Sequence, residues 1–118
     1  MSLRLIANWK LNGSSDFNNQ WASGFLENYH GQNFSFLGIA PASVFIDHIK
    51  GLLGDHGVQI GAQNIDSENV GARTGEISAS MIQDIGCKFS IIGHSERRTL
   101  FQESNSIIHQ KLIQANHY

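Results

Sequence analysis

A histidine followed by a glutamate and two arginines lies near the C-terminal end of this chain. An apolar run from Cys87 to Ile92 stops at Gly93, and His94 follows at once, trailed by polar and charged residues. The run contains β-branched and aromatic residues, which predicts a short strand. A titratable imidazole at the tip of a strand, beside charged side chains, is the layout of a functional site on a rigid scaffold. A lone histidine could equally be a cap, so its role depends on its neighbours.

A second pair of polar side chains ends a strand predicted near the N-terminus. The segment 3–10 is strand-like, and successive residues of a strand point to opposite faces. Asn8 and Lys10 should therefore project to one side, and Ala7 and Trp9 to the other. An amide and an ammonium group would then extend together from the C-terminal end of this strand.

The elements that position these side chains alternate along the chain. Strands are predicted at 3–10, 34–40, 58–63 and 87–92, and helices at about 17–29, 43–53, 77–85 and 104–116. Four β-α units predict an α/β fold in one domain, residues 1–118, with parallel strands and outer helices. Chemistry in such folds gathers at the C-terminal ends of strands, where Asn8, Lys10 and His94 all lie. The polar connection 64–75 is unusually long and is a candidate functional loop.

The composition is that of a globular protein. Of its 118 residues, 41% are hydrophobic and 15% are charged, which predicts one soluble domain with a real core. The net charge of −2 argues against a nucleic-acid or membrane-surface partner. The single cysteine, Cys87, excludes an internal disulfide and is expected in the core. The first apolar run is too short for a signal peptide, so a cytoplasmic protein is expected.

Four blocks of the sequence resemble the triose-phosphate isomerase family, in the family's order. They are Ala7-Asn8-Trp9-Lys10-Leu11-Asn12-Gly13, Gly61-Ala62-Gln63-Asn64, Thr74-Gly75-Glu76-Ile77-Ser78 and Ile92-Gly93-His94-Ser95-Glu96-Arg97-Arg98. The resemblance implies a TIM barrel, of which this chain would be the half with four β-α units. It also implies an enzyme of glycolysis and gluconeogenesis that interconverts dihydroxyacetone phosphate and glyceraldehyde 3-phosphate through an enediolate. A phosphorylated triose substrate, a homodimer and the absence of any metal or organic cofactor are implied as well.

The resemblance assigns roles to individual residues. His94 matches the electrophile that polarises the substrate carbonyl, and Asn8 matches a donor to a substrate oxygen. Lys10 matches the lysine that offers positive charge to the phosphate and the enediolate, and Glu96 matches a carboxylate near that lysine. Such donors favour the transition state because they face an oxygen that gains negative charge. Three further residues are expected at the subunit interface: Thr74, Glu76 and Arg97.

The chain also departs from the family pattern. TIM barrels are roughly twice this length, and the family's catalytic glutamate, lid loop and glycine-rich phosphate loops have no counterpart here. Arg73 stands where the family usually has an aromatic, which bears on dimer packing. Three hypotheses therefore remain: an isomerase represented by its N-terminal half, an inactive truncated half-barrel, and another half-barrel that binds phosphorylated sugars.

Other interpretations of the same residues are weaker. His94 and Glu96 have the His-x-Glu form of zinc deaminases, but the Cys-x-x-Cys that those enzymes need is absent. The glycines at 51, 54, 57 and 61 form no dinucleotide fingerprint. Arg97 and Arg98 could pair with Glu76 or Glu103 instead of binding substrate. The remaining histidines show no paired ligand spacing and are expected on the surface: His30, His48, His56, His109 and His117.

The predicted sheet would leave one face and two edges open. Ile6, Ile60 and Ile92 are in step with the strand-end polar residues and are expected on the inner face. Four parallel strands cannot close a barrel, which takes about eight. We therefore expect the isolated chain to form a homodimer of half-barrels or an aggregating species, not a well-packed monomer.

Overall fold

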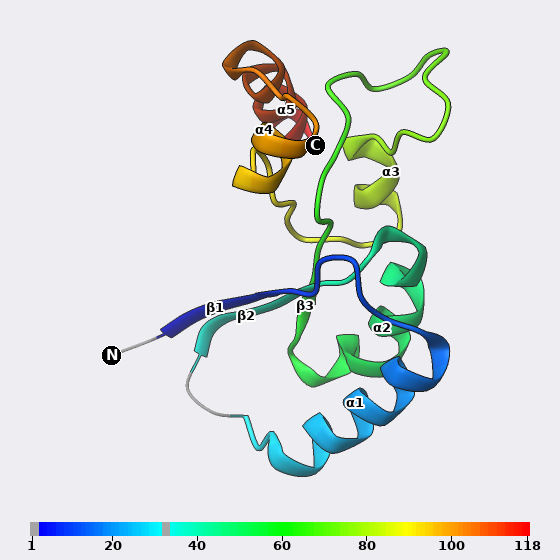
Figure 1. Cartoon of the computed structure of the whole chain (residues 1–118). Helices are drawn as coiled ribbons and strands as arrows, with labels where there is room; N and C mark the ends of the chain where they lie inside the picture. Colours follow the sequence, from blue (N-terminus) through cyan, green and yellow to red (C-terminus); the bar gives the residue numbers. More distant parts are fainter. Residues whose placement is uncertain (1–2, 32–33) are drawn as a thin grey trace.

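A parallel sheet of three strands lies across the middle of the structure, a computed structural model that describes residues 3–31 and 34–118 (Figure 1). The strand order is β1 (Leu3–Asn8), β2 (Phe34–Ala40) and β3 (Gln59–Ile60). The described residues also form five α-helices, of which the first two lie between the strands in sequence and the other three come after β3. They are α1 (Ser15–Asn28), α2 (Ile46–Leu53), α3 (Ala79–Asp84), α4 (Ser95–Leu100) and α5 (Asn105–His117). Figure 1 shows α1 and α2 on one side of the sheet and α3, α4 and α5 on the other. Two short 3₁₀ helices flank α2: η1 (Ser43–Phe45) and η2 (Gly54–His56). The parallel α/β class predicted from the sequence is confirmed.

The hydrophobic core lies between the sheet and the helices α1 and α2. On β2, Ile39 is 2% exposed, and on α2 Ile46, Ile49 and Leu53 are each 1% exposed or less. The spacing of the three α2 residues places them on one face of the helix. Cys87 belongs to the same buried cluster, as expected, and burial raises the pKa of its thiol. None of the described helices has the length and apolar character needed to span a bilayer.

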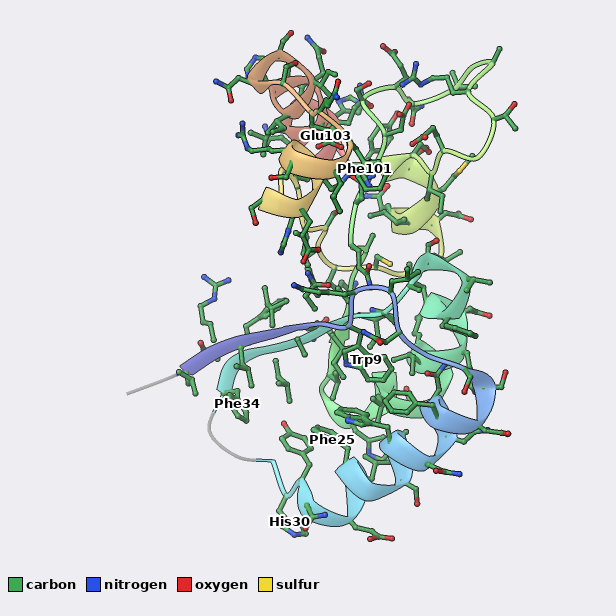
Figure 2. All side chains as sticks on the ribbon, viewed as in Figure 1. Trp9, Phe25, His30, Phe34, Phe101 and Glu103 are labelled. Atoms are coloured by element: carbon green, nitrogen blue, oxygen red, sulfur yellow. The ribbon has the colours of Figure 1, made fainter. Side chains whose placement is uncertain are left out.

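Alternation along β1 separates its two faces as predicted. The ring centroid of Trp9 lies 5.7 Å from that of Phe17 and 4.9 Å from that of Trp21, both on α1 (Figure 2). Trp9 is thus on the helix side of the sheet. Asn8 and Lys10 lie on the other side and line a cleft.

Serine hydroxyls start three of the helices. The Oγ atoms of Ser14, Ser78 and Ser104 accept hydrogen bonds from backbone N–H groups three residues further on, at 3.0, 3.2 and 3.2 Å. Each bond satisfies a donor that the first helical turn leaves without a partner. These serines lie at or within three residues of the starts of the helices predicted at about 17–29, 77–85 and 104–116. Residues 32–33, between the predicted helix at about 17–29 and the predicted strand at 34–40, lie outside the described residues.

The predicted fourth strand is wrong as a regular strand. Within 87–92, Ser90 forms only an isolated parallel bridge with Ala62. The N–H of Lys88 donates to the carbonyl of Ile60, and the N–H of Ile91 donates to that of Ala62, both at 2.9 Å. The segment therefore runs beside β3 without becoming a strand. Positive φ angles of 90° at Gly86 and 68° at Gly93 turn the chain sharply on both sides and leave little length for a ladder.

Ile60 was also assigned to the wrong face. It is 3% exposed, pairs in register with Ile39 and belongs to the core under the helices. Gly61 takes the inner face instead, because the ring of Phe89 covers it so closely that a Cβ there would lie 2.6 Å from ring atoms. Ile6 is 50% exposed, as an open inner face predicts, whereas Ile92 is partly buried against the core.

Candidate active site

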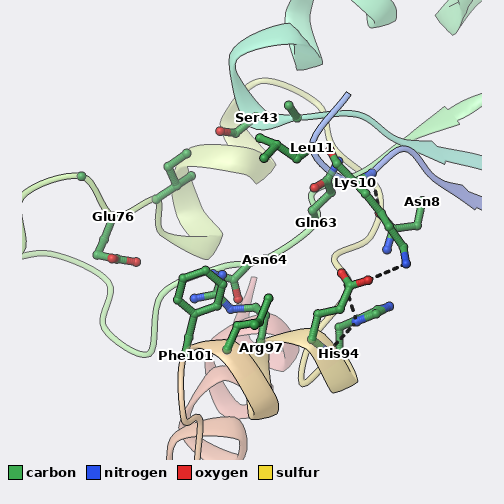
Figure 3. A pocket seen from close by; sticks show the side chains of 15 residues that line it. Asn8, Lys10, Leu11, Ser43, Gln63, Asn64, Glu76, His94, Arg97 and Phe101 are labelled. Carbon is green, nitrogen blue, oxygen red and sulfur yellow. Dashed lines mark hydrogen bonds and ion pairs between the residues drawn. The ribbon is translucent and has the colours of Figure 1, made fainter. Parts of the chain in front are cut away.

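The strand ends open into a cleft of about 640 Å³ (Figure 3). Asn8 and Lys10 reach it from the end of β1, and Gln63 from the residues after β3. His94 and Glu96 reach it from the start of α4. The convergence predicted for Asn8, Lys10 and His94 is therefore present in the structure. Gln63 lay in a block that resembles the family, but it was given no role.

Lys10 is held in an uncommon backbone conformation. Its φ of 55° is left-handed, which few residues other than glycine adopt. Its N–H donates to Asn8 Oδ1 at 3.0 Å, and its carbonyl accepts from Gln63 Nε2 at 2.9 Å. The same Gln63 nitrogen donates to the carbonyl of Ala40 at 3.0 Å, which ties the Lys10 turn to the end of β2. Such conformations persist where the surroundings enforce them, and they cluster at functional sites.

The ring of His94 is fixed by the helix that follows it. His94 is the N-cap of α4, and its Nδ1 accepts a hydrogen bond from the N–H of Glu96 at 3.0 Å. A ring nitrogen that accepts an N–H bond carries no proton. With Nδ1 accepting this bond, Nε2 is the ring nitrogen left to act as a donor. The Glu96 carboxylate lies 3.7 Å from Nδ1, too far for a hydrogen bond to compete with this one.

Glu96 joins His94 to Lys10. Its Oε1 lies 2.5 Å from Lys10 Nζ, and both side chains are about half exposed, at 47% and 51%. The hydrogen bond from Lys10, aided by its charge, lowers the pKa of Glu96. Glu96 is thus a stable anion that positions the ammonium group and not a proton acceptor near neutral pH.

Comparison with known proteins places the chain in a family. The family model for triosephosphate isomerase matches residues 3–118. The chain belongs to the triosephosphate isomerase family. Proteins named triosephosphate isomerase from Nitrosococcus oceani and Francisella tularensis subsp. mediasiatica are 38% identical over 111 residues and 40% identical over 112 residues. A third, from Photorhabdus laumondii subsp. laumondii, is 40% identical over 107 residues.

The matches cover nearly all of this chain but less than half of each relative. They span 94%, 95% and 91% of the chain, and 44%, 44% and 42% of the three relatives. The family membership therefore rests on almost every residue described here. More than half of each whole isomerase has no counterpart in these 118 residues.

Arg97 lies beside the cleft but is bonded to a carboxylate of its own chain. Its Nε lies 2.5 Å from Glu103 Oε2, and Lys111 Nζ lies 2.5 Å from the same oxygen. Lys111 also donates to Asn64 Oδ1 at 2.8 Å, which links α5 to the residues after β3. Burial opposes ionisation of Glu103, but the bonds from Lys111 and Arg97 outweigh it and lower its pKa. The pairing of Arg97 with Glu103 was one of the alternatives, while the part of Lys111 was missed.

In the loop between β3 and α3, Arg73 forms an ion pair with Asp66 of the same loop. Its Nε and Nη2 contact Asp66 Oδ2 and Oδ1 at 2.5 and 2.9 Å, a two-point contact that suits a guanidinium group and a carboxylate. Asp66 is 5% exposed, whereas Thr74 and Glu76 are exposed. Glu76 lines the cleft, and Thr74 does not. In this isomerase-family chain, the residue in the aromatic's place therefore stabilises its own loop.

This pair should make stability depend on pH. The hydrogen bond from Arg73 lowers the pKa of Asp66 in the folded chain, relative to about 3.9 in an unfolded one. The stabilisation is present above about pH 4 and is lost as the pH falls through the folded pKa. We expect Asp66→Asn to lower the urea midpoint at pH 7 and the difference from wild type to shrink towards about pH 3. Asp55→Asn, at an exposed carboxylate, is the matched control. A difference that stayed constant across this range would contradict the ion pair.

His48 connects helices and lies away from the cleft. Its Nδ1 accepts from Asn18 Nδ2 at 3.3 Å, and its Nε2 donates to Asn19 Oδ1 at 3.2 Å, so it ties α2 to α1. Among residues 3–31 and 34–118, no three His, Cys, Asp or Glu side chains come together as a metal site.

Proposed function

We propose that this chain is the N-terminal half of a triose-phosphate isomerase, a half-barrel of four β-α units that supplies one side of the active site. The whole enzyme would interconvert dihydroxyacetone phosphate and glyceraldehyde 3-phosphate through an enediolate. It would act in the cytoplasm, in glycolysis and gluconeogenesis. The observation that carries the proposal is the Lys10–Glu96–His94 arrangement, in which the His94 ring is fixed with Nε2 left to donate.

Four side chains of the cleft have a role in this reaction. The carbonyl oxygen of the substrate gains negative charge as the enediolate forms, and His94 Nε2–H donates to it. Lys10 adds positive charge towards the phosphate and the enediolate, and Glu96 keeps the ammonium group in place. Asn8 uses its oxygen to bind the Lys10 N–H, which leaves its amide nitrogen for a substrate oxygen. Groups that are oriented before the reaction stabilise its transition state without reorganising.

We place the proton acceptor outside this cleft wall. The carboxylates that line the cleft are Glu76 and Glu96. Glu96 is paired with Lys10, which lowers its pKa, whereas a general base works best with a pKa near the working pH. The family resemblance places the base in the half of the enzyme that follows. The isolated chain should thus hold the electrophile without the base.

The loop that precedes α3, which carries Thr74 and Glu76 beside the cleft, is the proposed contact with a second subunit of the whole enzyme. We call this part of the surface the rim of the cleft. Thr74 and Glu76 are exposed on the loop that precedes α3. Arg97 lies next to this rim, although Glu103 binds its guanidinium group. Val70, 85% exposed near the tip of the same loop, adds an apolar side chain.

Restoring the missing half tests the proposal directly. The completed protein is this chain fused to the portion of the Francisella relative that it does not cover, produced in a host without its own isomerase. We expect no turnover of glyceraldehyde 3-phosphate above the spontaneous rate from the isolated chain. The completed protein should turn over at an enzymatic rate, since general acid–base help alone contributes about 10²–10⁴-fold.

The outcomes separate the hypotheses. Ordinary enzymatic rates from the 118-residue chain alone would show that a base is present and would refute the division proposed here. A completed protein that folds cooperatively yet stays inactive would favour the inactive half-barrel. A coupled assay for dihydroxyacetone phosphate, with circular dichroism to check folding, decides between them.

A further inference from the structure

The segment that holds Lys10 in place is fixed by its side chains. Gln63 Nε2 donates to the Lys10 carbonyl at 2.9 Å. Hydrogen bonds between backbone groups run along this part of the chain as far as Ala62 and begin again at Asp66. Within the described chain, residues 63–65 make none of these bonds. The contacts of the three side chains therefore decide where Gln63 lies.

A lysine of α5 holds the residue next to Gln63. Lys111 Nζ donates to Asn64 Oδ1 at 2.8 Å, and the Lys111 side chain is 5% exposed. Figure 3 shows Gln63 beside Lys10 and Asn64 towards Arg97. The two neighbouring residues thus bind in different directions. One is held by a buried ammonium group, and the other holds the backbone of Lys10.

The ammonium group of Lys111 is itself fixed. Glu103 Oε2 accepts hydrogen bonds from Lys111 Nζ and from Arg97 Nε, both at 2.5 Å. Bonds of this kind, between a cation and a carboxylate, are short and strong. A lysine side chain is long and flexible, but here its charged end is bound on two sides in the interior. Lys111 can therefore pass the position of α5 on to Asn64.

We infer that Lys111 is a positioning residue for the proposed reaction and acts on Lys10 through Asn64 and Gln63. The inference rests on the proposed function, in which the Lys10 ammonium group faces the phosphate and the enediolate. Lys111 does not line the cleft, so it acts without touching the substrate. The left-handed turn at Lys10 depends on its surroundings. A misplacement of about 1 Å that originates far from the chemistry can cost about 10²-fold in rate.

A double-mutant cycle in the completed protein tests the link to Lys10. Lys111→Met should lower kcat/KM by about tenfold to 10²-fold. Both kcat and KM should change, as for Lys10→Ala, because the displaced charge acts in the ground state and the transition state. When Lys10→Ala is already present, Lys111→Met should cost less than about twofold, because the group that it positions is gone. A loss of tenfold or more in that background would overturn the inference.

Loss of stability must be separated from loss of position, because Lys111→Met also breaks a buried ion pair. Glu103→Leu combined with Lys111→Met removes both charges, which should restore the melting temperature but not the bond to Asn64. Its kcat/KM should stay as low as that of Lys111→Met. Glu103→Gln keeps both Lys111 and an acceptor for it, so kcat/KM should remain within about twofold of the parent. Recovery of kcat/KM together with the melting temperature in the double variant would overturn the inference.

A further readout does not depend on activity. In the folded completed protein, the side-chain N–H groups of Gln63 should exchange with water about tenfold faster in the double variant than in the parent, as measured by NMR. Those of Gln20, an exposed residue of α1, should not change. An inactive but folded protein would refute the proposed function, and this measurement would still decide the role of Lys111. Equal exchange at Gln63 in the two proteins would overturn it.

Discussion

Replacing His94 by Gln in the completed protein should lower kcat by about 10²–10³-fold, with a smaller effect on KM. The loss is that of one preorganised donor aimed at the oxygen where charge develops. The hydrogen bond from His94 strengthens as the enediolate forms, so its removal acts mainly on the transition state. Steady-state kinetics with glyceraldehyde 3-phosphate, over a full range of substrate concentrations, would measure both constants.

The comparison needs a histidine of similar structure and a different task. His48 also accepts a hydrogen bond on Nδ1, but from Asn18 and away from the cleft. His48→Gln should therefore leave kcat within about twofold of the parent, even if it lowers the melting temperature. Lys10→Ala should damage both kcat and KM, because a positive charge facing the phosphate acts in the ground state too. Wild-type kinetics in both His94→Gln and Lys10→Ala would refute the assignment of the cleft.

Lys111→Met should destabilise the chain by about 3–5 kcal/mol, the usual cost of removing one partner from a buried ion pair. The side chains of Lys111 and Glu103 are each 5% exposed, and both Lys111 Nζ and Arg97 Nε bind Glu103 Oε2. Removing the ammonium group leaves a buried carboxylate with one cation in place of two. The hydrogen bond to Asn64 is lost at the same time. Urea denaturation at pH 7 would give the change in the free energy of unfolding.

Two further variants make this prediction specific. Lys88→Met removes an exposed lysine and should change the stability by less than about 0.5 kcal/mol. Glu103→Leu combined with Lys111→Met removes both buried charges and should recover much of the loss, because a buried pair is costly chiefly when it is broken. A double variant as unstable as the sum of its parts would show that the network stabilises the fold in some other way.

The sequence by itself determined the class of the fold, and it predicted that Asn8, Lys10 and His94 would meet at the ends of the strands, as they do in the cleft. The order of apolar runs and breakers predicted parallel strands with outer helices, and β2 was located at its observed residues. The predicted alternation separated Trp9 from Asn8 and Lys10 as observed, although β1 ends at Asn8 and Lys10 has a left-handed backbone. The serines at 14, 78 and 104 lie at helix starts for a similarly local reason, the need of the first N–H groups for an acceptor.

Only the tertiary structure decided which residues share a face or a partner across the chain. Ile60 faces the core and not the expected inner face, where the Phe89 ring lies over Gly61, a contact between residues far apart in sequence. The contact of Gln63 with Lys10, and those of Lys111 with Asn64 and Glu103, likewise join residues of different elements. Local spacing cannot specify such contacts, because they depend on how helices and strands pack. The segment 87–92 carries strand-forming residues, yet it bridges only at Ser90, since a regular strand needs a neighbouring ladder as well as propensity.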